Sequence, residues 1–447
     1  MRVAVIGAGI VGVTTAYELA ADGHEVTVFE RRGSVAAETS FANAGVIAPG
    51  YVTPWAAPGM PSKVLRMMFS RHAAVRMRAS LDPALLGWLW RWWRACRPEV
   101  WQANRTSMQR LALFSRGRLH ELMRKLQLDF EHETGYLVLL RSAAELAAAR
   151  PGLKLLTELG GRFHLVDAAR CREIEPGLNP DTALHAGIHL PDDEVGNCRQ
   201  FAHLLRTEAQ KLGVRWCFHT QVQRLVPGRT PQVVHRYLPP AESTQLLIEP
   251  SSTSNGGPAT EPAPLEPVSE DFDAVVVCAA MGAPDLLRPH GLKLPLRAVH
   301  GYSITAPLRP DDLPSERAPR AALMDERYKV AISRIGQRIR VAGSAELGGS
   351  LEKYDPAALE TLYKVLNDWF PGAGRMSQVQ RWKGARPMLP DGPPVLGASG
   401  IEGLWLNLGH GSSGWALACG SAFALAQSIA GRDAPISLDG LGIARLR

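Results

Sequence analysis

The first 30 residues constrain the fold of this chain more than any other segment, because they combine a compact glycine motif with two strand-like runs. Residues 2–6 are a short apolar run, residues 10–21 have the composition of a helix, and residues 25–29 alternate like a second strand. A strand, a helix and a second strand within this length predict a βαβ unit, in which the two strands are parallel neighbours. The chain is therefore predicted to contain a parallel α/β sheet.

The glycines of this unit predict an adenine-dinucleotide site. Gly7, Gly9 and Gly12 have the spacing G-x-G-x-x-G and fall between the first strand and the helix. They permit a tight turn, a close approach of the backbone to a pyrophosphate, and close packing of helix on strand. Glu30 ends the second strand, where its carboxylate can accept hydrogen bonds from ribose hydroxyls and would repel a 2′-phosphate. The motif favours FAD or NAD over NADP, and it does not distinguish FAD from NAD.

Composition excludes several other classes of protein. A length of 447 residues predicts about two domains, and 46% hydrophobic with 21% charged residues is typical of a globular chain. The net charge of +7 is scattered without a long Lys/Arg block, which disfavours a nucleic-acid partner. Six cysteines without a C-x-x-C pair predict reduced thiols in a cytoplasmic protein, with no disulfide framework and no metal site. Residues 403–431 lack charged side chains, but their glycines, Asn407 and His410 favour a strand, a loop and a buried helix over a membrane span.

The remaining pattern predicts a mixed α/β fold, in which a discontinuous Rossmann-like domain carries an inserted domain with an antiparallel or mixed sheet. Helices are expected over residues 63–130, 201–212 and 359–370 and after residue 411. Strands are expected over 135–140, 187–190, 214–219, 274–278, 301–305, 330–333, 338–343 and 404–408. Residues 42–61 are expected to be a long loop, and residues 227–270, rich in Pro, Ser, Thr and Gly, a loop insertion or extended hairpin. The predicted dinucleotide domain comprises residues 1–75, 192–285 and 390–447, and the predicted substrate domain comprises 76–191 and 286–389.

Several further motifs make the chain similar to a known family. These motifs are Glu38-Thr39-Ser40-x-x-Asn43-Ala44-Gly45, Gly196-x-Cys198, Gly301-Tyr302-Ser303, Trp382-x-Gly384-Ala385-Arg386-Pro387-Met388-x-Pro390-Asp391 and Gly409-His410-Gly411-x-x-Gly414-Trp415. Together they resemble the D-amino-acid oxidase superfamily of FAD enzymes over nearly the whole chain, and most closely its bacterial D-amino-acid dehydrogenase small-subunit type. The chain departs from that pattern in residues 227–270, in residues 278–282 and at Leu389, where a small polar residue is expected.

The resemblance implies non-covalent FAD. Ser40 would bind the pyrophosphate, residues 43–46 would run beside the isoalloxazine, Val222 would touch adenine, and residues 409–414 would place a helix N-terminus at the flavin N1–C2=O edge. The residues expected to bind the cofactor are Gly7, Gly9, Ile10, Val11, Gly12, Glu30, Arg31, Ser40, Asn43, Ala44, Gly45, Val46, Val222, Ala279, Gly409, Gly411, Ser412 and Gly414.

For the substrate, the resemblance implies that Arg386 grips a carboxylate with its guanidinium, unless it pairs with Asp391 in the same loop. Tyr51 and Tyr302 are expected either to line the substrate pocket or to be core tyrosines. His410 lies near the flavin or is structural. The implied reaction is oxidative deamination of a small neutral D-amino acid such as D-alanine by hydride transfer to the flavin, giving a 2-oxo acid and ammonia.

The alternatives are oxidation of a secondary amine such as sarcosine or glycine, and a non-catalytic subunit that carries FAD for electron transfer. A nicotinamide enzyme is disfavoured, since it would leave the C-terminal glycine loop without a purpose. The expected electron acceptor is a quinone or a carrier. The segment from Trp88 to Trp101, with interleaved arginines, predicts either a core helix or peripheral contact with the inner face of the plasma membrane.

Overall fold

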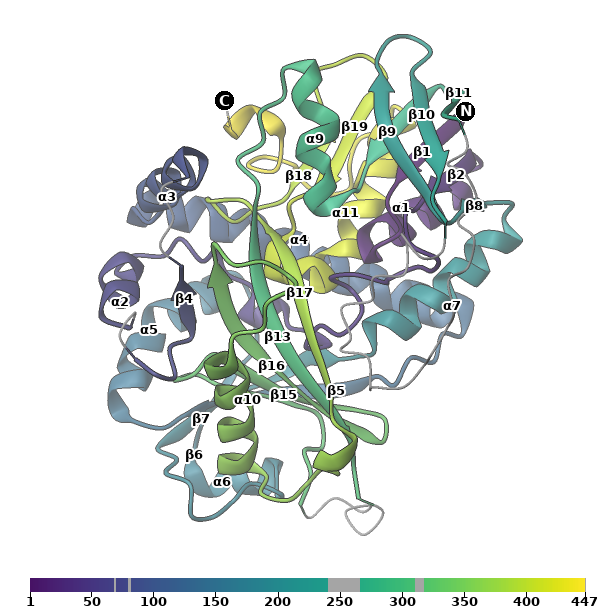
Figure 1. Cartoon of the computed structure of the whole chain (residues 1–447). Coiled ribbons are helices and arrows are strands. Elements are labelled where there is room, and N and C mark those ends of the chain that lie inside the picture. Colours follow the sequence, from purple (N-terminus) through teal and green to yellow (C-terminus); the bar gives the residue numbers. More distant parts are fainter. Residues whose placement is uncertain (68–69, 79–81, 240–265, 310–316, 447) are drawn as a thin grey trace.

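Two large β-sheets organise the computed structural model, which describes residues 1–67, 70–78, 82–239, 266–309 and 317–446 (Figure 1). The first sheet has the strand order β18-β19-β12-β1-β2-β8, and its members are parallel except β18. Its strands are β1 (Arg2–Ile6), β2 (Glu25–Phe29), β8 (Arg215–Cys217), β12 (Ala274–Val277), β18 (Val395–Ala398) and β19 (Leu404–Leu408). Strands from both ends of the chain meet in this sheet, which confirms the discontinuous dinucleotide-binding fold.

The N-terminal βαβ unit is confirmed at the predicted residues, with helix α1 spanning Ile10–Ala21. The last four residues of β1 are almost completely buried, as expected for a parallel strand covered on both faces. Three more helices pack with α1 on this sheet: α4 (Pro98–Leu126), α7 (Cys198–Lys211) and α11 (Gly414–Ile429). Their apolar faces bury the largest hydrophobic core of the described residues.

The second sheet has ten strands and is mostly antiparallel. Its main order is β17-β13-β16-β15-β14-β5-β7-β3, with β4 beside β16 and β6 beside β7. Its strands are β3 (Val46–Ile47), β4 (Val75–Met77), β5 (Glu133–Leu140), β6 (His164–Asp167), β7 (Ala186–Val195), β13 (Arg297–Pro307), β14 (Ala322–Asp325), β15 (Val330–Ile335), β16 (Arg338–Leu347) and β17 (Gln380–Met388). Helix α10 (Pro356–Trp369) covers one face of this sheet (Figure 1).

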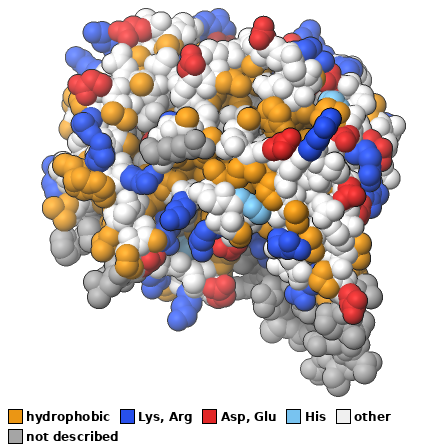
Figure 2. Space-filling model, turned by 90° about the horizontal axis from the view of Figure 1, so that it is seen from above, with side chains coloured by type: hydrophobic (Ala, Val, Ile, Leu, Met, Phe, Trp, Pro, Cys, Tyr) orange, Lys and Arg blue, Asp and Glu red, His pale blue; other side chains and the backbone are white. Residues whose placement is uncertain are grey.

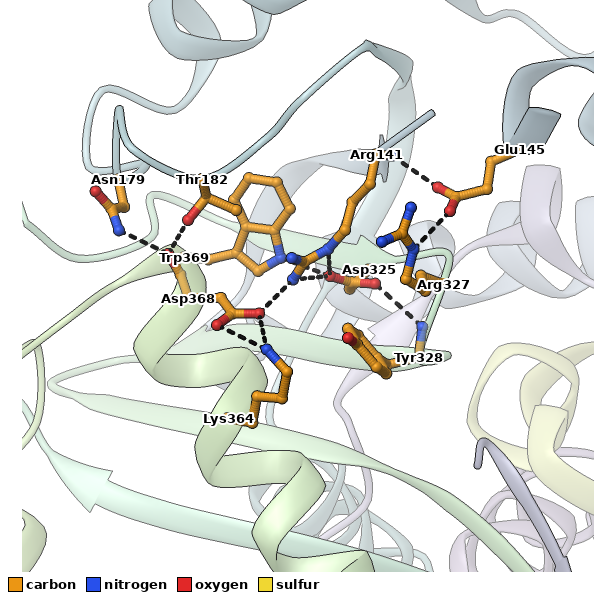
Figure 3. Close-up of polar contacts among 10 residues, drawn as sticks. All are labelled: Arg141, Glu145, Asn179, Thr182, Asp325, Arg327, Tyr328, Lys364, Asp368 and Trp369. Carbon is orange, nitrogen blue, oxygen red and sulfur yellow. Dashed lines mark hydrogen bonds and ion pairs between the residues drawn. The ribbon is translucent and has the colours of Figure 1, made fainter. Parts of the chain in front are cut away.

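A buried acidic residue fastens α10 to the second sheet (Figure 3). The Asp325 carboxylate, 1% exposed, accepts hydrogen bonds from Arg141, from the Trp369 indole and from the Tyr328 backbone N–H. Arg141 also pairs with Asp368 at 2.8 Å, so the guanidinium joins β5 and β14 to the end of α10. One of these three donors is a charged guanidinium, and together they compensate the cost of burying the Asp325 carboxylate.

The predicted insertion at residues 227–270 is a β-hairpin where the structure describes it. Strands β10 (Gln232–Tyr237) and β11 (Val268–Asp271) pair antiparallel and join β9 (Thr220–Val226) in a three-stranded sheet. This hairpin projects beside β9 at the upper edge of Figure 1. The rest of the insertion lies outside the described residues.

Some elements differ from the sequence-based expectation. Residues 63–130 were expected to be helical throughout, but they contain β4, which pairs with β16. The other helices are α2 (Met60–Met67), α3 (Pro83–Ala95), α5 (Ala143–Glu158), α6 (Ala168–Ile174) and α9 (Ala283–Leu287). The predicted domain division stays a proposal. Helix α4, expected in the substrate domain, packs in the core of the first sheet, because it buries its apolar face against α11. Strand β3, expected in the dinucleotide domain, belongs to the second sheet. No helix of the described residues has the length and hydropathy that crossing a membrane requires.

Candidate active site

A cavity of about 480 Å³ opens at the carboxyl ends of the parallel strands, where open α/β sheets bind ligands. It brings together thirteen residues predicted for the site from four distant segments of the chain. These are Gly7, Gly9, Ile10, Val11, Glu30, Arg31, Ser40, Val222, Ala279, Gly409, His410, Gly411 and Gly414. Gly12, Asn43, Ala44, Gly45, Val46 and Ser412 are not among the lining residues.

The glycine turn has the backbone geometry that a dinucleotide requires. Gly7 has φ +102, and a Cβ on Gly12 would lie 1.9 Å from the Gly7 carbonyl oxygen. Gly12 therefore acts in packing rather than as a lining residue, as its place in the motif predicts. Helix α1 has Gly9 as its N-cap without a side-chain cap, and the Ser40 hydroxyl accepts a hydrogen bond from the Ile10 N–H at 3.0 Å. The helix N-terminus and Ser40 thus face the same part of the cavity, a favourable position for a pyrophosphate.

Glu30 directly follows β2 and lines the cavity. Its carboxylate accepts hydrogen bonds from the backbone N–H groups of Ala8 at 2.7 Å and Arg32 at 2.8 Å, while burial raises its pKa. Neighbouring Arg31 donates to both oxygens of Glu38, another lining residue. Glu30 is held in the orientation that a ribose-binding carboxylate needs, since its own backbone partners fix both oxygens.

The C-terminal glycine loop forms the opposite wall. Helix α11 begins at Gly414, and its N-cap, Ser413, makes no side-chain cap, so its first N–H groups are left for other acceptors. His410 is 3% exposed, its Nε2 lies 3.1 Å from the Ser421 hydroxyl, and burial lowers its pKa to about 3. His410 is therefore a neutral, hydrogen-bonded member of the wall at physiological pH.

Leu389, which departs from the family pattern, lies under this loop. It is 2% exposed, and its Cδ1 lies 2.6 Å from the position of a Cβ on Gly409. The side chain belongs to the hydrophobic core below the first sheet. Gly409 leaves room for the Leu389 side chain, which packs in this core.

Arg386 is a partly buried cation that forms no ion pair within the described part of the chain. Its Nη1 donates to the Ser344 carbonyl oxygen at 2.9 Å, its Cζ lies 5.9 Å from the Trp55 ring centre, and burial lowers its pKa to about 10. Asp391, the alternative partner considered from the sequence, pairs with Arg445 at 2.8 Å. Arg386 precedes Pro387, which lines the cavity, but Arg386 itself is not among the lining residues. Its guanidinium packs against Gly301 and has no carboxylate partner among the described residues.

The two candidate tyrosines lie elsewhere. Tyr302 is 1% exposed, and its hydroxyl donates to the buried Glu346, which also accepts from Lys383 at 2.7 Å. Because side chains alternate along β13, Tyr302 points away from the face that carries Gly301 and Ser303. The Tyr51 hydroxyl donates to Glu326 at 2.8 Å. Both tyrosines make structural hydrogen bonds, and neither lines the cavity.

Sequence reasoning missed several polar lining residues. Glu38, Thr39, Thr220, Gln221, Gln223, Asp285 and Asn407 all face the cavity. Glu38 and Thr39 belong to the same quoted motif as Ser40, so the motif could have identified them. The others lie in the first half of β9, in α9 and near the end of β19, and only the tertiary structure brings these distant segments to one cavity.

The chain matches the family described as "FAD dependent oxidoreductase" over residues 2–428. A protein named D-amino acid dehydrogenase from Cereibacter sphaeroides is 44% identical over 449 residues, which cover all of this chain and 95% of that protein. Proteins of the same name from Rhizorhabdus wittichii and Vibrio cholerae are 40% and 39% identical. Each alignment covers all of this chain, with 100% and 99% of the relative.

Solved structures with the same fold are more distant in sequence. Glycine oxidase from Geobacillus kaustophilus superimposes with a TM-score of 0.71 at 18% identity, covering 99% of both chains. L-proline dehydrogenase from P. horikoshii gives 0.69 at 16% identity, covering 100% of this chain and 97% of that one. These two enzymes act on different amines by name, so the shared fold does not identify the substrate.

Proposed function

Because this chain belongs to the FAD-dependent oxidoreductase family, we propose that it oxidises small neutral D-amino acids such as D-alanine. The relatives named D-amino acid dehydrogenase, at 39–44% identity over the whole chain, support this substrate class. The single structural observation that carries the proposal is that Arg386, next in the chain to the cavity-lining Pro387, has no carboxylate partner among the described residues. Such a group binds a substrate carboxylate at two points and so fixes its orientation.

The residues of the chain divide the work between cofactor and substrate. The α1 N-terminus and Ser40 would hold the pyrophosphate, Glu30 the ribose, and the first N–H groups of α11 the ring system. FAD, when bound, supplies the hydride acceptor for the Cα–H bond. Arg386 would fix the carboxylate, so that the Cα hydrogen of one enantiomer points to the cofactor. The imino acid released then takes up water, giving the 2-oxo acid and ammonia.

An anaerobic reduction tests this function. The purified, FAD-loaded protein is mixed with D-alanine, L-alanine or sarcosine, and bleaching of the flavin absorbance is followed. We expect D-alanine alone to bleach it rapidly. Faster bleaching by sarcosine would show a secondary-amine oxidase, and no bleaching by any of the three would indicate an electron-transfer subunit instead.

Variants of Arg386 test its role separately. Arg386→Leu removes the charge and Arg386→Lys keeps it but loses the planar fork, so KM for D-alanine should rise about 100-fold and about 10-fold, respectively. FAD affinity should stay the same in both variants. An unchanged KM in Arg386→Leu would remove Arg386 from the carboxylate role.

For the electron acceptor we propose a quinone reached at the inner face of the plasma membrane. Helix α3 has a buried face with Trp88 and an outer face on which Trp90 and Trp93 are 59% and 53% exposed and stack at 5.0 Å. Figure 2 shows hydrophobic side chains gathered at the edge on which α3 lies in Figure 1. Exposed Arg94 follows Trp93 in the helix, and tryptophan with arginine suits an anionic lipid interface.

Flotation with vesicles containing phosphatidylglycerol tests the membrane contact. We expect the wild-type protein to float and the double variant Trp90→Ser, Trp93→Ser to stay in solution. Tyr237→Ser is the control, since Tyr237 is 41% exposed on β10, on the other side of the molecule. A wild-type protein that does not float would refute the contact.

A further inference from the structure

The loop of residues 42–45, between the cavity and the second sheet, has every backbone carbonyl occupied by a donor. The Ser303 hydroxyl donates to the Ala42 oxygen at 2.8 Å, and the Ser333 hydroxyl donates to the Ala44 oxygen at 2.7 Å. The Gly196 N–H donates to the Gly45 oxygen, also at 2.8 Å. Backbone carbonyls in loops commonly bond to water, so fixation of four consecutive ones by protein groups is a specific arrangement.

The Asn43 carbonyl has the most unusual partner. Arg340 donates to it from Nη1 at 3.0 Å and donates from Nε to the Thr305 hydroxyl at 3.0 Å. Arg340 is 6% exposed, and none of the ion pairs within the described residues includes it. Burial lowers its pKa to about 10, so the guanidinium stays charged at neutral pH. A buried cation held only by neutral acceptors is costly, which indicates an electrostatic role.

The side chains that hold the loop and Arg340 come from three adjacent strands and share one face of the second sheet. Ser333 on β15 lies opposite Arg340 on β16, which lies opposite Thr305 on β13, and Ser303 precedes Thr305 by two residues. Two residues further back on β13 is Gly301, and its missing side chain leaves room for the Arg386 guanidinium. The loop is therefore fixed on the sheet face that carries Arg386, while Thr39 and Ser40 just before it line the FAD cavity.

We propose that Ser303, Ser333 and Arg340 are positioning residues that hold loop 42–45 against the flavin ring, and that Arg340 supplies a fixed positive charge favouring the reduced flavin. We call these three side chains the loop clamp. The proposal rests on the proposed function in taking FAD to fill the cavity, and on the family resemblance in taking residues 43–46, just after the lining residues Thr39 and Ser40, to lie beside the isoalloxazine. Reduction adds negative charge to the ring system, and a preorganised cation in a dry environment stabilises that charge.

The test compares clamp variants with matched controls on two readouts that need no amino acid. The readouts are the dissociation constant of FAD from titration of the apoprotein, and the midpoint potential from dithionite reduction with a reference dye. The variants are Arg340→Met, Arg340→Lys and Ser333→Ala. The controls are Arg105→Met and Ser107→Ala, because Arg105 is 6% exposed and donates to the Gly152 carbonyl, while Ser107 is 8% exposed and donates to the Asp439 carbonyl.

For Arg340→Met we expect the FAD dissociation constant to rise about 10-fold, since a charge-assisted hydrogen bond is lost. We also expect the preference for reduced over oxidised flavin to fall about tenfold, which lowers the two-electron potential by about 30 mV. Arg340→Lys should keep the potential but bind FAD more weakly, because an ammonium cannot reach Thr305 and Asn43 together. Ser333→Ala should raise the FAD dissociation constant about fivefold and leave the midpoint potential unchanged.

The loop clamp would be overturned if Arg340→Met and Ser333→Ala both kept the wild-type FAD dissociation constant and midpoint potential. It would also be overturned if the control variants showed equal shifts in these two quantities. If Arg340→Met does not fold, Arg340→Lys and Ser333→Ala carry the test, and wild-type FAD affinity in both would overturn it. A wild-type flavin that D-alanine fails to reduce would refute the proposed function instead, since neither clamp readout uses the substrate.

Discussion

A single methyl group at Gly301 should displace the guanidinium of Arg386. A Cβ built on Gly301 would lie 2.3 Å from Nη2 of Arg386, 2.6 Å from Cζ and 3.0 Å from Nε. The three nearest atoms belong to the end of a flexible side chain, so the arginine must move while the backbone can stay. Gly301→Ala therefore changes the place of the charge without removing it.

The magnitude follows from the interactions at risk. A hydrogen bond to a charged group contributes about 1.5–3 kcal/mol, and about 1.4 kcal/mol corresponds to a tenfold change in binding. Misplacing the two-point contact with a carboxylate should therefore raise KM for D-alanine about 10- to 100-fold. Stability should change by less than about 1 kcal/mol, since alanine restricts the unfolded chain and partly offsets the local strain.

Steady-state kinetics, inhibition by propionate and thermal unfolding check this expectation together. Propionate has the carboxylate of alanine without its amine, so its inhibition constant reports carboxylate binding alone. Gly117→Ala is the control, because a Cβ there meets nothing within 4 Å. A Gly301→Ala enzyme with wild-type KM and propionate inhibition would refute the assignment of Arg386 to the carboxylate.

Three other substitutions probe the fold and the cofactor site. Gly12→Ala puts a Cβ 1.9 Å from the Gly7 carbonyl oxygen, so titration of the apoprotein should show FAD affinity reduced more than about 100-fold; near-normal affinity would contradict the motif. Asp325→Ala leaves Arg141 and the Trp369 indole without their buried partner, and urea unfolding should show a loss of about 3–5 kcal/mol, whereas a loss below about 1 kcal/mol would show that solvent replaces it. Burial raises the pKa of Asp193 from 3.8 to about 7, so the folded state binds the proton more tightly and its stability falls as pH rises from about 4 to 7. Asp193→Asn should remove this pH-dependent loss of stability, so the variant should be more stable than wild type by about 2–4 kcal/mol at pH 8 but not at pH 4. Urea unfolding that gives the same difference in free energy between variant and wild type at both pH values would contradict this.

The local features of the cofactor site followed from the sequence because they depend on neighbours in the chain. The turn at Gly7, the packing at Gly12 and the acid at Glu30 lie within one βαβ unit, and short-range sterics and hydrogen bonds determine their geometry. Helix α1 and strands β1 and β2 consequently begin and end at the predicted residues. The motif around Arg386 pointed to a carboxylate-binding group, but the sequence left open whether Asp391 neutralises it.

Only the tertiary structure decided what surrounds those groups. Asp391 pairs with Arg445, 54 positions away, which leaves Arg386 without an acidic partner in the described chain. Gly301-Tyr302-Ser303 was one motif in the sequence, but the alternation of a strand sends Tyr302 to Glu346 and Ser303 to the loop at Ala42. Long-range pairing of strands sets these partners, and a residue's neighbours along the chain carry no record of which strand will lie beside it. The sequence by itself therefore determined the cofactor class and the carboxylate-binding candidate, whereas the fold determined which charges are paired, which residues meet at the cavity, and how its loop is held.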